Sequence, residues 1–192
     1  MKDLTFRQAA ESDFNRIREI ALKGWMFAYS HLPKDKLVRL VNKYYSVGSL
    51  TISLERVRIG TDSFIVAELD GKAIGFCHVT ASIGIGELLR LYIDTSYIRK
   101  GVGKGLLLLG EKFLISKKCK KYFTFVNRHN RVGLDFYTRN GFVRAKKKDK
   151  EDEFKEGKVL WCMEKNLLND ELQKQKMREL WDNRHDEEWE KA

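Results

Sequence analysis

Residues 88–109 read LLRLYIDTSYIRKGVGKGLLLL, and this stretch decides the fold. It begins with residues typical of a strand, continues with glycines at 101, 103 and 105, and ends in four leucines. This order predicts a strand, a tight glycine turn and a helix that continues to about residue 116. Glycine lets the main chain turn sharply and approach a ligand, and the first turn of a helix presents free N–H groups. The stretch therefore predicts a site for an anion such as a phosphate.

The charge around this turn is concentrated. From Tyr97 to Lys121 there are eight Lys or Arg and one acid, Glu111, so the window carries 8 − 1 = +7 of a total net charge of +10. Such basicity suits either a phosphorylated small ligand or nucleic acid. A Walker loop is absent, and Leu106 stands where the dinucleotide-binding pattern G-x-G-x-x-G requires its last glycine. Taken alone, the glycines are also consistent with a turn that binds nothing.

The segments around this stretch predict a sheet of mixed direction. Asp70-Gly71 separates two β-rich runs, 64–69 and 73–79, which is a hairpin signal. We expect further strands at 4–9, 88–93, 122–126, 142–143 and 159–163, and helices at 12–29, 33–45 and 130–140, with a polar connection at 46–63 and a charged loop at 146–157. Strands that alternate with helices after a hairpin indicate an α/β fold with six or seven strands and flanking helices.

Length and composition predict one folded domain with an appendage. The chain has 192 residues, of which 43% are hydrophobic, and four are Trp, so a substantial core can form. We assign residues 1–166 to the domain. Residues 167–192 hold five Lys or Arg against eight Asp or Glu, with apolar residues partly at helical spacing, and we expect a charged helical extension that could mediate a homodimer.

Targeting and metal signals are missing from the sequence. No run approaches the roughly 18 apolar residues that a membrane helix needs, and the first residues lack the apolar core of a signal peptide. We therefore expect a cytoplasmic protein with no membrane partner. Cys77, Cys119 and Cys162 show no zinc-ligand spacing, so we expect buried, reduced thiols and no metal.

Two blocks resemble motifs of the GNAT family of N-acetyltransferases. Residues 91–103, LYIDTSYIRKGVG, resemble its central motif, whose turn reads Gln or Arg, two residues, Gly, one residue, Gly or Ala. Residues 130–142, N-x-x-G-x-x-F-Y-x-x-x-G-F, resemble its N-x-x-A-x-x-F-Y-x-x-x-G-F segment. Both blocks occur in the family's order, within a matching pattern of elements from residue 3 to about 166. One position departs from the family pattern. Ile98 stands where the family has Gln or Arg, and Arg99 follows one place later.

The resemblance implies acetyl-CoA as cosubstrate and direct attack of an amine on the thioester, without a covalent enzyme intermediate. It implies that the main chain of Leu91, Tyr92 and Ile93 pairs with the pantetheine arm where two parallel strands part. The diphosphate would lie on the turn, and Asn130 would contact the cofactor in addition to capping a helix. The turn residues implied are Arg99, Lys100, Gly101, Val102, Gly103 and Lys104.

The resemblance also implies two catalytic residues. Tyr137 matches the family tyrosine that protonates the departing thiolate, whose pKa is about 8.5, although an aromatic packed beside Phe136 is the alternative. Glu87 matches an acid that accepts the amine's proton, needed because an ammonium with a pKa of about 10.4 is a poor nucleophile. A solvated carboxylate is the alternative for Glu87, and His78 is a second candidate base.

The acceptor remains open at this point. Residues 24–33, with Trp25 and Tyr29 as candidate substrate-binding residues, resemble a branch that includes polyamine acetyltransferases, although aromatics at this spacing also suit a core. A polyamine or other small amine is the first hypothesis, and the net charge of +10 opposes a polycation. The alternatives are a protein amino group, a degenerate acetyl-CoA sensor suggested by Ile98, and a nucleic-acid-binding module, which ranks last because aromatics are sparse in the basic window.

Overall fold

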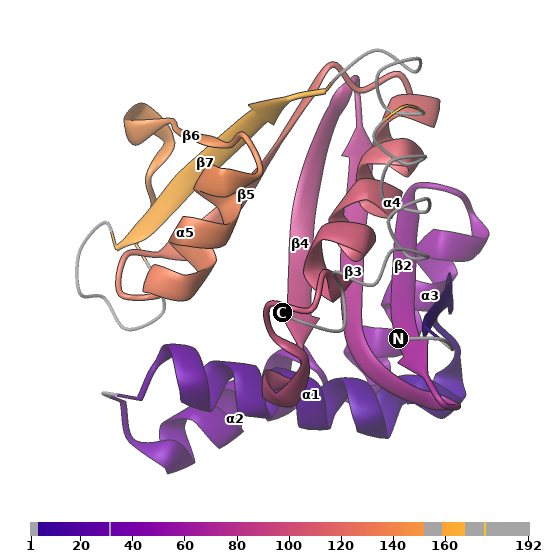
Figure 1. Ribbon diagram of the computed structural model, residues 1–192, viewed down its shortest axis with the longest axis vertical. Helices are drawn as coiled ribbons and strands as arrows, with labels where there is room; N and C mark the ends of the chain where they lie inside the picture. The colour runs from indigo at the N-terminus through magenta and orange to yellow at the C-terminus, as the bar shows by residue number, and fades with distance from the viewer. Residues whose placement is uncertain (1–3, 31, 152–158, 168–174, 176–192) are drawn as a thin grey trace.

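A seven-stranded mixed sheet forms the centre of the molecule (Figure 1). The computed structural model describes residues 4–30, 32–151, 159–167 and 175. The strand order is β1-β2-β3-β4-β5-β7-β6, and every neighbouring pair is antiparallel except β4 and β5, which are parallel. The strands are β1 (Leu4–Gln8), β2 (Asp62–Leu69), β3 (Lys72–Ser82), β4 (Ile85–Ile93), β5 (Lys121–Asn127), β6 (Val143–Arg144) and β7 (Leu160–Asn166). The predicted α/β sheet of six or seven strands is confirmed.

Helices cover both faces of this sheet (Figure 1). The helices are α1 (Phe14–Ala28), α2 (Lys34–Tyr44), α3 (Val47–Arg58), α4 (Val102–Ser116) and α5 (Arg131–Arg139), with short 3-10 turns η1 (Glu11–Asp13), η2 (Thr95–Tyr97) and η3 (Lys146–Lys148). One buried core joins α4 and α5 to the sheet, and a second joins α1, α2 and α3 to it. The apolar run that follows the glycine turn contributes to the first core, since Leu106 and Leu107 are buried in it.

Helix α3 corrects the expectation of a polar connection at 46–63. Ser46 caps it by accepting a hydrogen bond from the Ser49 N–H at 3.2 Å, and Leu50 and Leu54 are buried against β2. The intervening residues are mostly polar or small, so the apolar face is narrow. Packing on the sheet, rather than a strong sequence pattern, therefore stabilises this helix.

The two parallel strands separate soon after they pair. Only Ile85–Glu87 of β4 pair with Lys121–Phe123 of β5, and beyond them the strands diverge (Figure 1). Glu87 is thus the third residue of β4 and the last of the pairing, because the strand begins at Ile85 rather than at the expected residue 88. Leu114 of α4 packs directly over Gly86, where a Cβ would lie 2.7 Å from both terminal methyl groups of Leu114. The point of separation is therefore tightly packed.

A buried polar cluster joins the two diverging halves of the sheet. Glu111 of α4 is only 2% exposed, and its carboxylate accepts hydrogen bonds from the Lys165 ammonium of β7 at 2.5 Å and from the Tyr122 hydroxyl of β5. Because a buried charge is costly unless it is paired, this cluster favours one arrangement of α4, β5 and β7.

The C-terminal extension lies mostly outside the described residues, so its helical structure and the division at residue 166 stay proposals. Leu167 is described, and its main-chain N–H donates to the Lys120 carbonyl at 2.9 Å. Among the described helices, none is both long and apolar enough to cross a membrane.

Gly86→Ala tests the packing where the strands part. We expect it to lower the free energy of unfolding by about 1–3 kcal/mol, because the added methyl group overlaps Leu114 and the Tyr122 Cβ, at 2.9 Å. Gly48→Ala is the control, because no atom lies within 4 Å of the added methyl group, and it should raise stability by up to about 1 kcal/mol. Urea unfolding of both variants measures this, and equal effects would contradict the packing account.

Candidate active site

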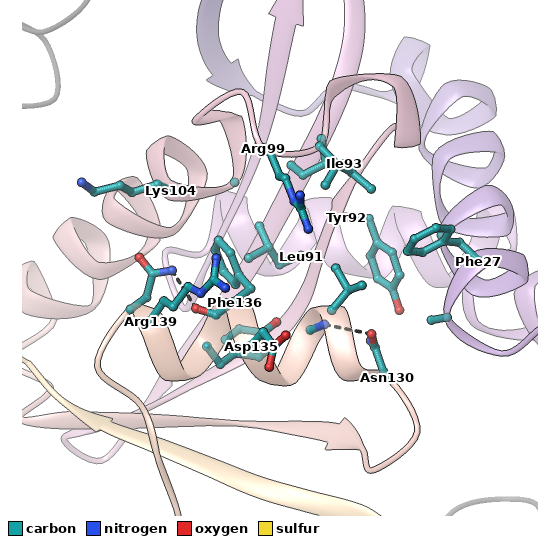
Figure 2. Close-up of a pocket in the computed structure, with 18 of the residues that line it drawn as sticks. Phe27, Leu91, Tyr92, Ile93, Arg99, Lys104, Asn130, Asp135, Phe136 and Arg139 are labelled. Atoms are coloured by element: carbon teal, nitrogen blue, oxygen red, sulfur yellow. Dashed lines mark hydrogen bonds between the residues drawn. The ribbon is translucent and has the colours of Figure 1, made fainter. Parts of the chain in front are cut away.

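A cavity of about 540 Å³ lies where β4 and β5 part (Figure 2). Its walls come from four segments far apart in sequence: the C-terminal part of α1, the end of β4, the turn that leads into α4, and α5. The lining residues are Gly24, Phe27, Ala28, Tyr29, Leu91, Tyr92, Ile93, Tyr97, Ile98, Arg99, Gly101, Gly103, Lys104, Asn130, Val132, Gly133, Asp135, Phe136, Tyr137, Arg139 and Asn140.

The end of β4 presents an open strand edge to this cavity. Leu91, Tyr92 and Ile93 line the cavity beyond the last residue that pairs with β5. At the start of the gap, the Thr124 hydroxyl of β5 donates to the Leu88 carbonyl at 2.9 Å. An open edge of this kind can hydrogen-bond an extended chain that carries amides, as an added strand would.

The turn between β4 and α4 combines left-handed backbone with basic side chains at the cavity. Arg99 and Gly101 have left-handed φ angles of 65° and 77°, and no side chain caps α4 at Gly101. The first turn of α4 borders the cavity at Gly103 and Lys104, and its free N–H groups have no side-chain acceptor at the cap. Arg99 reaches toward the cavity, while Lys104 extends along α4 away from it (Figure 2). Together with Arg139 of α5, they outnumber the single acid of the lining, Asp135.

Two of the predicted cofactor-binding residues do not line the cavity. The Lys100 ammonium lies 5.3 Å from the centre of the Tyr97 ring, and Val102 is fully buried. Ile98, at the position where the family has Gln or Arg, does line the cavity. The side chain at this position is thus apolar, and the nearest cation of the turn is one residue later.

Tyr137 projects from α5 into the cavity lining and is 8% exposed. Burial raises the pKa of its hydroxyl well above the usual value, and the Thr124 hydroxyl opposes this shift. The hydroxyl therefore stays protonated at neutral pH and can serve as a proton donor. Phe136 packs against the first turn of α4, since a Cβ on Gly103 would lie 3.3 Å from its ring.

Asn130 has the predicted capping role and also lines the cavity. Its side-chain oxygen accepts a hydrogen bond from the Gly133 N–H at 2.9 Å, shown as a dashed line in Figure 2. Helix α5 then ends before Gly141, whose φ of 85° suits glycine.

The two candidate substrate-binding residues differ in position. Tyr29 lines the cavity, whereas Trp25 does not. The Trp25 indole N–H donates to the Tyr92 hydroxyl at 2.8 Å, and its ring lies 5.5 Å from that of Tyr29. Tyr92 in turn packs closely on Gly24 of α1, where a Cβ would lie 2.7 Å from its ring. Trp25 thus supports the cavity wall. His31, in the same segment 24–33, lies outside the described residues.

Glu87 and His78 lie outside the cavity lining. Glu87 is half-buried at the last β4–β5 pair, and burial raises the pKa of its carboxyl, an effect that Lys150 partly opposes. His78 is 2% exposed, its ring stacks on Phe64, and its Nε2 is 2.8 Å from the Asp62 carboxylate. Burial lowers the pKa of His78, so it is a packed, neutral histidine.

Sequence reasoning missed much of the α5 wall. Val132, Asp135, Phe136, Arg139 and Asn140 all line the cavity. They follow helical spacing from the cap at Asn130, so the helical period of this segment was the signal that could have found them. The cysteines are buried and free, as expected, and within the described residues no three His, Cys, Asp or Glu side chains are grouped to hold a metal.

Comparisons with known proteins identify the family of this chain. Residues 60–144 match the model of the acetyltransferase (GNAT) domain. Spermidine N(1)-acetyltransferase of Thermoplasma acidophilum is 30% identical over 141 residues, which cover 72% of this chain and 88% of the relative. The chain belongs to the GNAT family of acetyltransferases.

Solved structures agree with this assignment. The crystal structure of PaiA N-acetyltransferase from Thermoplasma acidophilum, in complex with coenzyme A, is 28% identical and superposes with a TM-score of 0.77 over 85% of this chain and 99% of that one. A GNAT acetyltransferase from Staphylococcus aureus, at 16% identity, shares the fold with a TM-score of 0.64 over 86% of this chain and 99% of that one. The expected family, fold and acetyl-CoA-dependent N-acetyltransferase activity are confirmed.

Proposed function

We propose that the enzyme binds acetyl-CoA in this cavity and transfers the acetyl group to a primary amine of a polyamine. The single observation that supports this acceptor class is the 30% identity to spermidine N(1)-acetyltransferase across 88% of that relative. The open edge of β4 suits the amide-bearing pantetheine arm, and the cationic turn suits the diphosphate.

The charges of the site are separated in a way that accommodates a cationic acceptor. Arg99, Lys104 and Arg139 line the cavity that we assign to the anionic cosubstrate. Glu87 lies outside that lining, at the base of the gap between β4 and β5. A polycation would be repelled by the cavity cations, so we place its reacting amine on the Glu87 side.

In the proposed mechanism, Glu87 accepts a proton from the acceptor's ammonium group, directly or through water, and the neutral amine attacks the thioester carbonyl. A C–N bond forms and the C–S bond breaks. Tyr137 donates its hydroxyl proton to the departing sulfur, the nitrogen loses its second proton as the amide forms, and that proton returns to Tyr137 through solvent. The proton on Glu87 leaves to solvent, which restores the enzyme. Tyr137 keeps its hydroxyl proton near neutral pH, and Glu87 acts as a base at pH values above its raised pKa.

Acceptor identity is tested with purified full-length enzyme, acetyl-CoA and a panel of spermidine, spermine, a lysine-containing peptide and a peptide with a free N-terminus. We expect thiol release and an N-acetylated product, seen by mass spectrometry, with the polyamines. Turnover confined to peptides would contradict the polyamine proposal and support a protein acetyltransferase. Calorimetric binding of acetyl-CoA without turnover of any amine would favour the sensor alternative.

Tyr137→Phe tests the proton donor. We expect kcat to fall about 100-fold or more, with the KM for acetyl-CoA within about twofold of wild type, because the hydroxyl acts mainly as the C–S bond breaks. Tyr44→Phe is the control, because it removes a tyrosine hydroxyl outside the cavity lining and should keep kcat. Unchanged turnover in Tyr137→Phe would assign this tyrosine a packing role only.

Glu87→Gln tests the base through the pH profile. Because burial raises the pKa of Glu87, wild-type kcat/KM should rise with pH through a value above the usual range for glutamate, as the active carboxylate forms. The variant should lack this acidic limb, and its kcat/KM should be lower by about 100-fold or more. Glu55→Gln, on the exposed side of α3, should keep the wild-type profile. An intact limb in Glu87→Gln would exclude Glu87 as the base.

A further inference from the structure

Asp94 joins three elements at the point where β4 ends and the anion-binding turn begins. Its side chain is 6% exposed. One carboxylate oxygen accepts hydrogen bonds from the Arg16 guanidinium at 2.5 Å and the Lys23 ammonium at 3.5 Å, and the other accepts the Ser96 N–H at 3.2 Å. Its main-chain N–H donates to the Ile74 carbonyl of β3 at 2.8 Å. The start of the turn is therefore attached to α1, to η2 and to the sheet.

Arg16 and Lys23 connect this carboxylate to the helix that forms the opposite wall. Both lie on α1, whose later residues Gly24, Phe27 and Ala28 line the cavity. Arg16 also donates to the Ala73 carbonyl of β3 at 2.8 Å and pairs with Glu19 at 2.6 Å. The Asp94 carboxylate thus connects two walls of the cavity while remaining outside its lining.

The turn needs such support because part of its backbone is in an unfavourable conformation. Arg99 has a φ of 65°, which residues other than glycine seldom adopt. Burial alone would raise the pKa of Asp94, but hydrogen bonds from Arg16 and Ser96 and the charge of Lys23 lower it, so the group is ionised at neutral pH. The ion pair is therefore present under the conditions of catalysis.

We propose that Asp94 is a positioning residue for cosubstrate binding, because its buried ion pair with α1 holds the anion-binding turn in place. This inference rests on the proposed function, in which that turn binds the diphosphate of acetyl-CoA. Asp94 acts through Arg99 and the first N–H groups of α4 and does not contact the cosubstrate itself.

The direction in which acetyl-CoA affinity changes when Asp94 is replaced distinguishes a positioning role from a direct electrostatic effect. Asp94 carries a negative charge close to a site for an anion, so its removal by electrostatics alone would strengthen acetyl-CoA binding. Loss of positioning would weaken binding instead. Asp94→Asn isolates the ion pair, because asparagine keeps an oxygen that can accept the Ser96 N–H.

The experiment measures the KM and calorimetric Kd for acetyl-CoA, with kcat and the thermal midpoint, in the wild type, Asp94→Asn and Asp13→Asn. Asp13 is a matched control, because its carboxylate is 7% exposed and accepts hydrogen bonds from Arg7 at 2.7 and 2.8 Å at the start of α1, outside the cavity lining. Both variants should lose stability. Only Asp94→Asn should raise the KM and Kd, on the order of tenfold, with kcat within about twofold.

Each outcome decides the inference. A lower or unchanged Kd in Asp94→Asn, beside normal binding by the wild type, overturns positioning and leaves the proposed function intact. Absence of binding by the wild type overturns the proposed function itself. Arg16→Lys covers the case in which Asp94→Asn does not fold, because lysine keeps the charge but cannot contact Asp94, the Ala73 carbonyl and Glu19 together as the guanidinium does, and it should also raise the Kd. A wild-type Kd in Arg16→Lys overturns the inference.

Discussion

Three residue pairs between β4 and β5 are the constraint on which the binding cavity depends. They hold the strands together at Ile85–Glu87 and Lys121–Phe123 and leave the rest of β4 without a neighbour on that side. Gly86 permits Leu114 of α4 to pack over this junction, and the buried cluster around Glu111 joins α4 to the diverging half of the sheet. The gap is therefore a feature of a packed structure, and its open backbone groups face a lined cavity.

The same arrangement separates the cations of the cavity from the carboxylate of Glu87. The basic turn, α4 and α5 contribute the cations of the cavity, while Glu87 lies at the base of the gap. In the proposed function, a chain of net charge +10 offers its anionic cosubstrate and a cationic acceptor separate approaches in this way. Helix α1 lines the cavity, and its Arg16 and Lys23 also pair with Asp94 at the start of the turn.

Turns and helix caps whose signal lies in adjacent residues were predicted from the sequence. Asp70 and Gly71 adopt the left-handed angles, 51° and 74°, that the hairpin signal requires, and Asn130 caps α5. Helix α3 was missed because its stability comes from packing on β2 rather than from a broad apolar face. The contact of Asp94 with Arg16 links residues 78 positions apart and has no local signal at all. The sequence left Trp25 as a candidate substrate-binding residue or a packed aromatic, because its hydrogen bond to Tyr92 joins two elements and has no local signal.

The residues beside the open edge of β4 also shield that edge from pairing with a strand of another polypeptide. An exposed strand edge invites another polypeptide to add to the sheet, which is a common route to aggregation. Here Phe27 on one side and Phe136 on the other line the cavity beside that edge (Figure 2). A polypeptide strand projects side chains to both faces at every second residue and needs more width than a slender amide-bearing arm. In the proposed function, this enclosure leaves room at the edge for the slender pantetheine arm and excludes a neighbouring chain.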